Sequence, residues 1–184
     1  MEDSNSGSFE FLAFAKDEKE KLFLSKFSAQ VKAENSRGKV INIVSFVDHL
    51  LAQLLVEFSP NQSKAQKLTS DLSGCLNTLM NKANVCHMLA LITDTEFEQV
   101  KFLANIRNDL AHDWRTDLTS PQISKRIDKV SVSDNGTSET KFMSICGQLV
   151  TKLHHRIEYA KILKEELPGK TLVDKISQMA PKRI

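Results

Sequence analysis

The 184-residue chain has few of the residues that interrupt helices, with only six glycines and four prolines. Its three cysteines, Cys75, Cys86 and Cys146, are odd in number and widely spaced, which argues against the disulfide framework of a small secreted protein. No run of about 18 apolar residues is present, so we expect no membrane-spanning helix and no membrane partner. These features predict a cytoplasmic protein.

The chain also lacks a large excess of either positive or negative charge. The 25 lysines and arginines nearly balance the 23 acidic residues, and the formal net charge is +2. Such a balance gives no overall attraction to nucleic acid, so any such contact must come from a local surface. Apolar residues make up 41% of the chain and charged residues 26%, close to the average for globular proteins.

The length predicts one domain with short flanking segments. We expect a flexible N-terminus at residues 1–8 and a single helical domain at residues 9–184. Within it, residues 37–167 are the expected core and residues 168–184 a docked or mobile tail. Pro168 and Gly169 mark the start of that tail.

Apolar residues recur at helical spacing along nearly the whole chain, which predicts an all-α bundle of about five to seven helices. The broad stripe of residues 39–58 is typical of a central helix. Thr93 and Glu96 form a capping-box start, and Ser120 with Pro121 forms a second start. Residues 129–139 are expected to be irregular or to form a hairpin. The predicted helices are residues 9–34 (one or two helices), 39–58, 63–71, 75–92, 93–114, 120–129 and 140–167.

Arg107 is the most unusual position, because helical-wheel spacing places it near the middle of an apolar arc on the fourth long helix. A buried arginine keeps its charge and must meet an anion, since leaving it unpaired costs several kcal/mol. Asp48, Glu57 and Asp109 are candidate partners within the chain. The alternative is an exposed groove or a dimer seam where Arg107 meets a phosphate. Trp114 lies on the same arc, so we expect it to pack in the core rather than stack on a base.

The order Arg107-Asn108-x3-His112 resembles the motif of the HEPN superfamily. The similarity extends over residues 36–38, 46–51 and 76–92, and over this wider range the chain resembles the bacterial mannitol operon repressor family. The resemblance covers roughly half of the chain. It implies a compact helical fold, a homodimer and control of sugar-alcohol uptake genes.

The favoured functional interpretation is therefore a non-enzymatic repressor of transcription that binds DNA or a regulatory protein. The candidate nucleic-acid contacts are Gln122, Lys125 and Arg126, on the short helix after Pro121, together with Arg115. This short helix and the predicted helix at residues 93–114 that precedes it resemble a helix-turn-helix, although no glycine marks the turn between them. A solvated polar face is the simpler interpretation of the same residues.

The alternative is a metal-independent endoribonuclease that cleaves RNA. His112 would transfer the proton and Arg107 would stabilise the phosphorane charge, while Asn108 would orient the imidazole or the phosphate. Arg107 and His112 lie five residues apart, about 140° around a straight helix, so one helix does not bring them together. This activity therefore requires a dimer.

Other chemistries find little support in the sequence. Cys75, Cys86 and His87 lack the spacing of zinc ligands, and Cys86 and Cys146 lie in apolar runs typical of small buried residues. No phosphate-binding glycine loop or nucleophile elbow is present. We expect no cofactor and no metal.

Overall fold

The structure is a computed structural model that describes residues 17–131 and 135–166, and within these residues it is helical with no strand. This confirms the predicted all-α bundle. The predicted flexible start, residues 9–16 of the first predicted helix and the predicted tail at residues 168–184 lie outside the described residues. The seven helices are α1 (Glu18–Ala33), α2 (Ser36–Phe58), α3 (Gln62–Ser70), α4 (Leu79–Met88), α5 (Asp94–His112), α6 (Pro121–Val130) and α7 (Ser138–Glu166).

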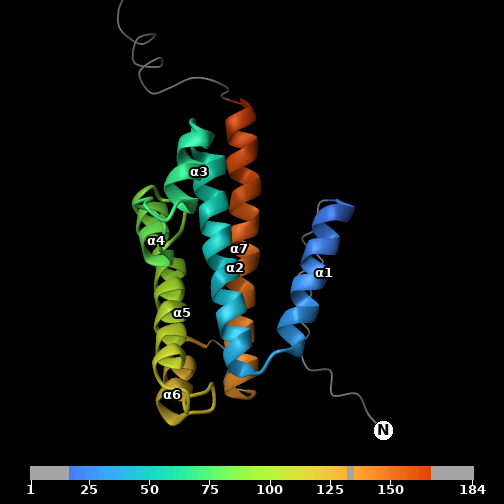
Figure 1. The fold of residues 1–184 in the computed structure, drawn as a ribbon, viewed down its shortest axis with the longest axis vertical. Coiled ribbons are helices and arrows are strands. Elements are labelled where there is room, and N and C mark those ends of the chain that lie inside the picture. The colour runs from blue at the N-terminus through green and yellow to red at the C-terminus, as the bar shows by residue number, and fades with distance from the viewer. Residues whose placement is uncertain (1–16, 132–134, 167–184) are drawn as a thin grey trace, which may run out of the picture.

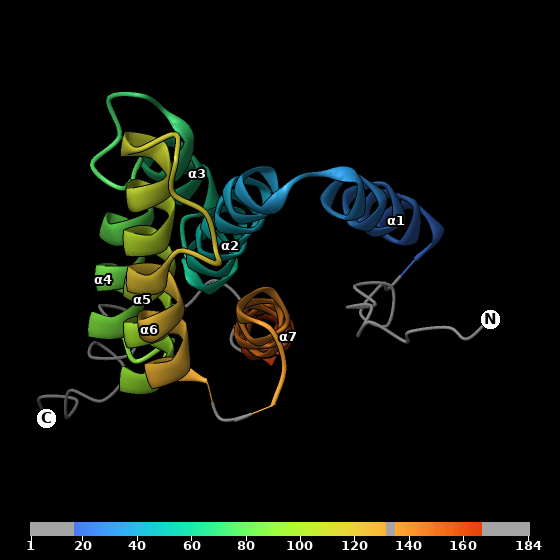
Figure 2. The ribbon, with the colours of Figure 1, turned by 90° about the horizontal axis from the view of Figure 1, so that it is seen from below.

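The helix α2 is the centre of the bundle, as its broad apolar stripe predicts. It packs along α7 and contacts α1, α3, α4 and α5 on its other sides. In Figure 1, α2 and α7 run in the same direction, while α1 and α5 run the opposite way. Figure 2 shows α1 on the far side of α2 from α4, α5 and α6.

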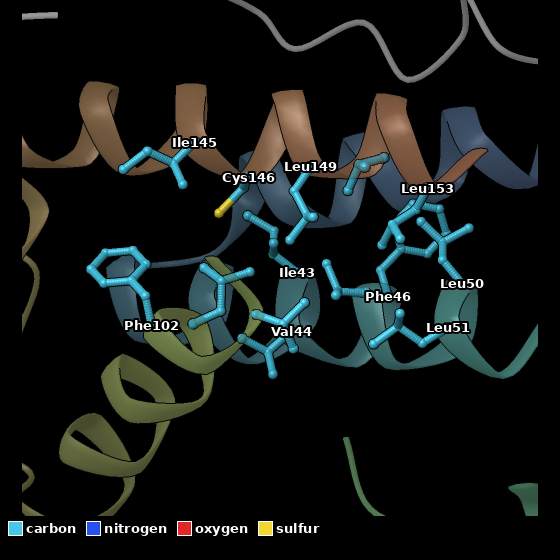
Figure 3. Close-up of a cluster of buried hydrophobic side chains, with 14 of the residues drawn as sticks. Ile43, Val44, Phe46, Leu50, Leu51, Phe102, Ile145, Cys146, Leu149 and Leu153 are labelled. Carbon is cyan, nitrogen blue, oxygen red and sulfur yellow. The ribbon is translucent and has the colours of Figure 1, made fainter. Parts of the chain in front are cut away.

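The core lies between α2 and α7 and extends to α5 (Figure 3). Apolar side chains of the two helices point toward each other and exclude water, which is the main stabilising term of such a bundle. The labelled side chains are Ile43, Val44, Phe46, Leu50 and Leu51 of α2, Phe102 of α5, and Ile145, Cys146, Leu149 and Leu153 of α7.

The break between the first two helices is shorter than predicted. Asn35 is the N-cap of α2, and its side-chain Oδ1 accepts a hydrogen bond from Gly38 N at 2.9 Å. Residues 36–38, predicted as a break, therefore form the first turn of α2, because the cap satisfies the free backbone donors of that turn.

The predicted helix at residues 75–92 is also shorter in the structure. Thr78 caps α4, and Gly74 and Asn77 belong to a turn that precedes it. At the other end Ala90 has a φ of 55°, and the N–H of Leu91 donates to the carbonyl of Cys86. This left-handed residue ends the helix as a Schellman motif.

The predicted start signals of α5 and α6 are confirmed. Thr93 Oγ1 accepts from Glu96 N at 3.3 Å, and Glu96 Oε2 accepts from Thr93 N at 2.8 Å. The helix α6 begins at Pro121, and its Ile123 and Ile127 are buried. Residues 129 and 130 are the end of α6, so they do not contribute to the predicted hairpin, and residues 132–134 lie outside the described part.

One of the described helices, α2, is long and apolar enough to cross a membrane by length and composition alone. The expectation that no segment has these properties was therefore too strict. Half of the apolar stretch is buried inside the protein, and the core helix of a soluble bundle has the same properties.

Candidate functional site

The predicted motif residues lie in the last turns of α5. The capping box at Thr93 fixes where α5 begins, and the helix ends at His112, two residues earlier than predicted. Figure 1 shows that α5 ends, and α2 begins, at the same end of the molecule, beside α6. The motif therefore lies at the end of the molecule where α5 ends, α2 begins and α6 is located.

Arg107 is exposed, which excludes the interpretation in which it points into the core and leaves the alternative in which it is exposed. Its Nη1 donates a hydrogen bond to Oδ1 of Asn108 at 3.1 Å. The buried face of α5 is centred on Leu103, Ile106 and Leu110, because α5 packs against α2, α4 and α7 from that side. Around the helix Arg107 falls between Val100 and Leu103, which are buried, but it lies in the last turns of α5, where its side chain is exposed.

The three carboxylates predicted to pair with Arg107 bind other groups. Asp48 accepts hydrogen bonds from the Lys82 ammonium at 2.8 and 2.9 Å. Asp109 pairs with Arg126, and Glu57 accepts from the side-chain amide of Gln62 at 2.9 Å. Among the described residues, the guanidinium of Arg107 therefore forms no ion pair.

Asn108 and His112 are exposed as well, on the polar stripe of α5 that the sequence predicts. Arg107 and Asn108 are hydrogen-bonded to each other, whereas His112 is the last residue of the helix, five positions beyond Arg107. This spacing places Arg107 and His112 on different sides of α5. A single chain therefore does not bring the imidazole and the guanidinium together.

The candidate nucleic-acid contacts of α6 all point outward. Gln122, Lys125 and Arg126 are exposed, whereas Ile123 and Ile127 of the same helix are buried. The Arg126 guanidinium pairs with Asp109, which links α6 to α5. Lys125 forms no ion pair with a residue of the described part. The prediction that these three residues face outward is confirmed, and their binding role stays a prediction.

Arg115 and Trp114 lie in the turn after α5. The Arg115 Nε donates to Asp113 Oδ1 at 3.2 Å, and the Arg115 backbone N–H donates to the same oxygen at 3.0 Å. The backbone hydrogen bond, followed by the side-chain bond, holds the pKa of Asp113 below its ordinary value. Trp114 is 84% exposed. The prediction that it packs in the core is wrong, because the helix has already ended and the chain has changed direction.

Arg37, which the sequence analysis did not single out, holds this turn in place. Its guanidinium donates to three backbone carbonyls: those of Leu110, of Asp113 at 2.8 Å and of Thr116 at 3.1 Å. The last carbonyls of a helix have no partner within it, and a cation near them also opposes the helix dipole. Arg37 thus serves as a side-chain cap for α5.

Two buried charged residues, Lys82 and Glu96, were also not predicted from the sequence. The Lys82 side chain is 2% exposed and pairs with Asp48, and the Glu96 side chain is 2% exposed and pairs with Arg156 at 2.9 Å. Burial alone would raise the pKa of Glu96. The hydrogen bond from the Thr93 backbone N–H and the contact with Arg156 outweigh burial, so the pKa lies below its ordinary value. Both pairs join helices and lie outside the motif.

The described residues include no group of three or more His, Cys, Asp or Glu that could hold a metal ion. Cys86 and Cys146 are buried, as predicted, and Cys75 is exposed. Burial raises the pKa of the Cys86 thiol to about 12, so this thiol stays protonated. These two cysteines act as small apolar residues.

Comparison with known protein families, with characterised proteins and with solved structures finds no match for the chain. The resemblance to the mannitol operon repressor family therefore rests only on the order of its motifs.

Proposed function

We propose that the protein is a cytoplasmic, homodimeric regulator of the mannitol operon repressor type, which acts by binding DNA or a regulatory protein. The observation that carries the proposal is the exposure of Arg107, with no carboxylate partner in the described part, together with the outward-facing Lys125 and Arg126 of α6, which the Arg126–Asp109 ion pair joins to α5. A cation without a carboxylate partner is free to meet a phosphate.

Contact with a phosphate backbone suits this surface. Phosphates are bound by arginine, lysine and polar side chains, and such contacts position a protein on DNA without reading its sequence. Asn108 and Gln122 supply neutral polar groups beside the cations. Arg115 and Arg126 would exchange or share their carboxylate partners, Asp113 and Asp109, when a phosphate binds.

A salt series tests direct binding to DNA. Fluorescence anisotropy of a labelled mixed-sequence duplex of about 20 base pairs should give affinity that falls steeply as salt rises, since bound phosphates release counterions. Replacing Arg107 and Lys125 by alanine together should weaken binding and lower the slope by about 2. The exposed Lys152 of α7 is the matched control, and Lys152→Ala should leave both values unchanged.

Lack of binding by the unaltered protein at low salt would contradict direct contact and leave only regulation through a protein partner. Equal loss in the control variant would contradict the assignment of the surface to α5 and α6.

A metal-independent ribonuclease is the second candidate, and the exposure of both Arg107 and His112 favours it. His112 would accept the proton of a 2′-hydroxyl while the 2′-oxygen attacks phosphorus, and the 5′-oxygen would leave by taking a proton from water. The products are a 2′,3′-cyclic phosphate and a 5′-hydroxyl end. Arg107 would stabilise the charge on the phosphorane oxygens, and Asn108 would hold the guanidinium. Each site would take Arg107 from one copy and His112 from the other.

Incubating the protein with unstructured RNA in EDTA tests this activity. Cleavage that disappears in both Arg107→Ala and His112→Ala would support it. Mixing the two inactive variants should then restore activity to about a quarter, because half of the randomly mixed dimers carry one intact site out of two. Cleavage that persists in His112→Ala would contradict this assignment.

A further inference from the structure

Trp114 is the chain's one tryptophan, and its side chain is exposed to solvent in the turn between α5 and α6. Tryptophan has the largest apolar side chain, and proteins usually bury most of it. The connection that carries it forms the lower end of the molecule in Figure 1, next to α6. Its exposure therefore needs an explanation.

A loose loop does not explain it. The backbone is bonded on both sides of Trp114, since Arg37 donates to the carbonyls of Asp113 and Thr116. The Thr116 N–H donates to the Asp113 carbonyl at 3.1 Å, and Thr116 itself is buried. The turn therefore holds the indole outward in a defined place.

The rest of the turn is fixed as well. Asp117 Oδ1 accepts from the Thr119 N–H at 2.9 Å, and Ser120 Oγ accepts from the Asp117 N–H at 2.9 Å. Leu118 is buried between these two groups and anchors the turn to the core. An exposed aromatic ring on such a support loses little conformational freedom when it binds a ligand.

The surroundings of Trp114 are charged rather than apolar. Arg115 has a side chain that is 73% exposed, and His112 is exposed at the end of α5. In the described part, the other large hydrophobic residues with exposed side chains lie on α1, α2, α4 and α7 or in the connections on either side of α4, and none lies on α5 or α6. Trp114 therefore does not belong to a larger exposed apolar patch of the kind that marks a protein–protein interface.

We propose that Trp114 is a stacking platform for an unpaired nucleobase, with the neighbouring Arg115 available to the phosphates of the same strand. Proteins bind single strands by this combination of aromatic rings and nearby cations. The inference rests on the proposed binding of nucleic acid, and it adds a site for an unpaired base of RNA or DNA in the turn that joins α5 to α6.

The single tryptophan makes the test direct, because its fluorescence reports on Trp114 alone. The full chain is titrated with unstructured RNA of about ten nucleotides, with DNA of the same sequence, and with that DNA as a duplex. Both single strands should quench the emission in a saturable way, and the duplex should quench it less. Quenching by RNA alone would still support the proposal and add recognition of the 2′-hydroxyl.

Variants give the second readout, through the anisotropy of labelled single strands. Trp114→Leu should weaken binding by about 5- to 150-fold, the range measured for loss of one stacked base, while Trp114→Phe should recover most of the affinity. Tyr159 of α7 is the matched control, since it is an aromatic residue 66% exposed on another helix. Tyr159→Leu should bind as the unaltered protein does.

Three results would overturn the proposal. Equal affinity of Trp114→Leu and the unaltered protein for single strands would remove the stacking role while leaving nucleic-acid binding intact. Absence of all binding would remove both. Sedimentation that shows self-association in the unaltered protein but not in Trp114→Leu would assign the ring to a protein contact.

Discussion

Arg37 gives the most informative test of how the end of α5 is built. We consider Arg37→Met, which removes the three hydrogen bonds to the carbonyls of Leu110, Asp113 and Thr116 but keeps an apolar stem of similar length. A hydrogen bond made by a charged group contributes about 1.5–3 kcal/mol, so three would sum to more than 4 kcal/mol.

Two effects reduce this sum. Arg37 lies in the first turn of α2, where a cation interacts unfavourably with the helix dipole. Removing the charge therefore regains about 0.3–1 kcal/mol. The side chain is also only half-buried, so water can replace part of the lost hydrogen bonding. We therefore expect a net loss of about 2–3 kcal/mol in the free energy of unfolding, and a fall in Tm of about 4–12 °C.

Urea unfolding followed by far-ultraviolet circular dichroism measures this loss. Lys64 is the matched control, because it is an exposed cation in the first turn of α3. Lys64→Met should change the free energy by less than about 0.5 kcal/mol. Arg37→Lys should lie between the two, since an ammonium cannot reach three carbonyls at once. A loss below about 0.5 kcal/mol for Arg37→Met would refute the idea that Arg37 caps α5.

Three other substitutions test local features of the fold. Ala90→Gly should stabilise the protein by about 0.5–1 kcal/mol, because alanine is strained at a φ of 55°, whereas Ala29→Gly inside α1 should cost about 1 kcal/mol; thermal unfolding distinguishes them. Gly74→Ala should destabilise by about 1–3 kcal/mol in urea unfolding, since its Cβ would lie 2.4 Å from the carbonyl oxygen of Leu68, and an unchanged value would contradict the close approach. Glu96 has a lowered pKa in the folded state, so its ionised form stabilises the fold above its ordinary pKa of 4.5, and this contribution is lost as pH falls through the folded pKa. The stability gap between the protein and Glu96→Gln should therefore narrow below about pH 4.5, and a gap that is constant with pH would exclude this linkage.

The sequence predicts the parts of the fold that depend on neighbouring residues. The capping box at Thr93 and Glu96 and the start at Ser120 and Pro121 are local patterns, and both helices begin where those patterns predict. The central position of α2 follows from the width of its apolar stripe, because a helix that is apolar on most sides must be covered on most sides.

Contacts between distant segments could not be predicted in the same way. Arg37 meets the carbonyl of Leu110, 73 residues away, and a backbone carbonyl has no signature in the sequence. Lys82 and Asp48 are 34 residues apart, and each looks like a solvated charge on its own helix. Only the packing of α4 on α2 shows that the lysine is buried.

The face of α5 that meets the core was misplaced for a related reason. Phe102 and Ile106 are both buried, but they were not part of the predicted arc, which was therefore centred on Arg107 rather than on Leu103. The predicted arc consisted of Phe97, Val100, Leu103, Ala104, Leu110, Ala111 and Trp114. Apolar spacing gives the period of a helix, but the neighbouring helices decide which part of a broad apolar surface they cover.

The exposure of Arg107 changes what its replacement should do. A buried cation that has lost its partner costs about 3–5 kcal/mol, and Asp48→Asn, which leaves the buried Lys82 ammonium without its carboxylate, is expected to approach that range. Arg107→Ala removes one exposed hydrogen bond to Asn108, so its free energy of unfolding should stay within about 0.5 kcal/mol of the unaltered protein. Parallel urea titrations of the two variants measure the contrast. If Arg107→Ala lost several kcal/mol, Arg107 would be a structural residue and its effect on binding could not be assigned to the surface; a neutral result makes any loss of nucleic-acid affinity a property of the site itself.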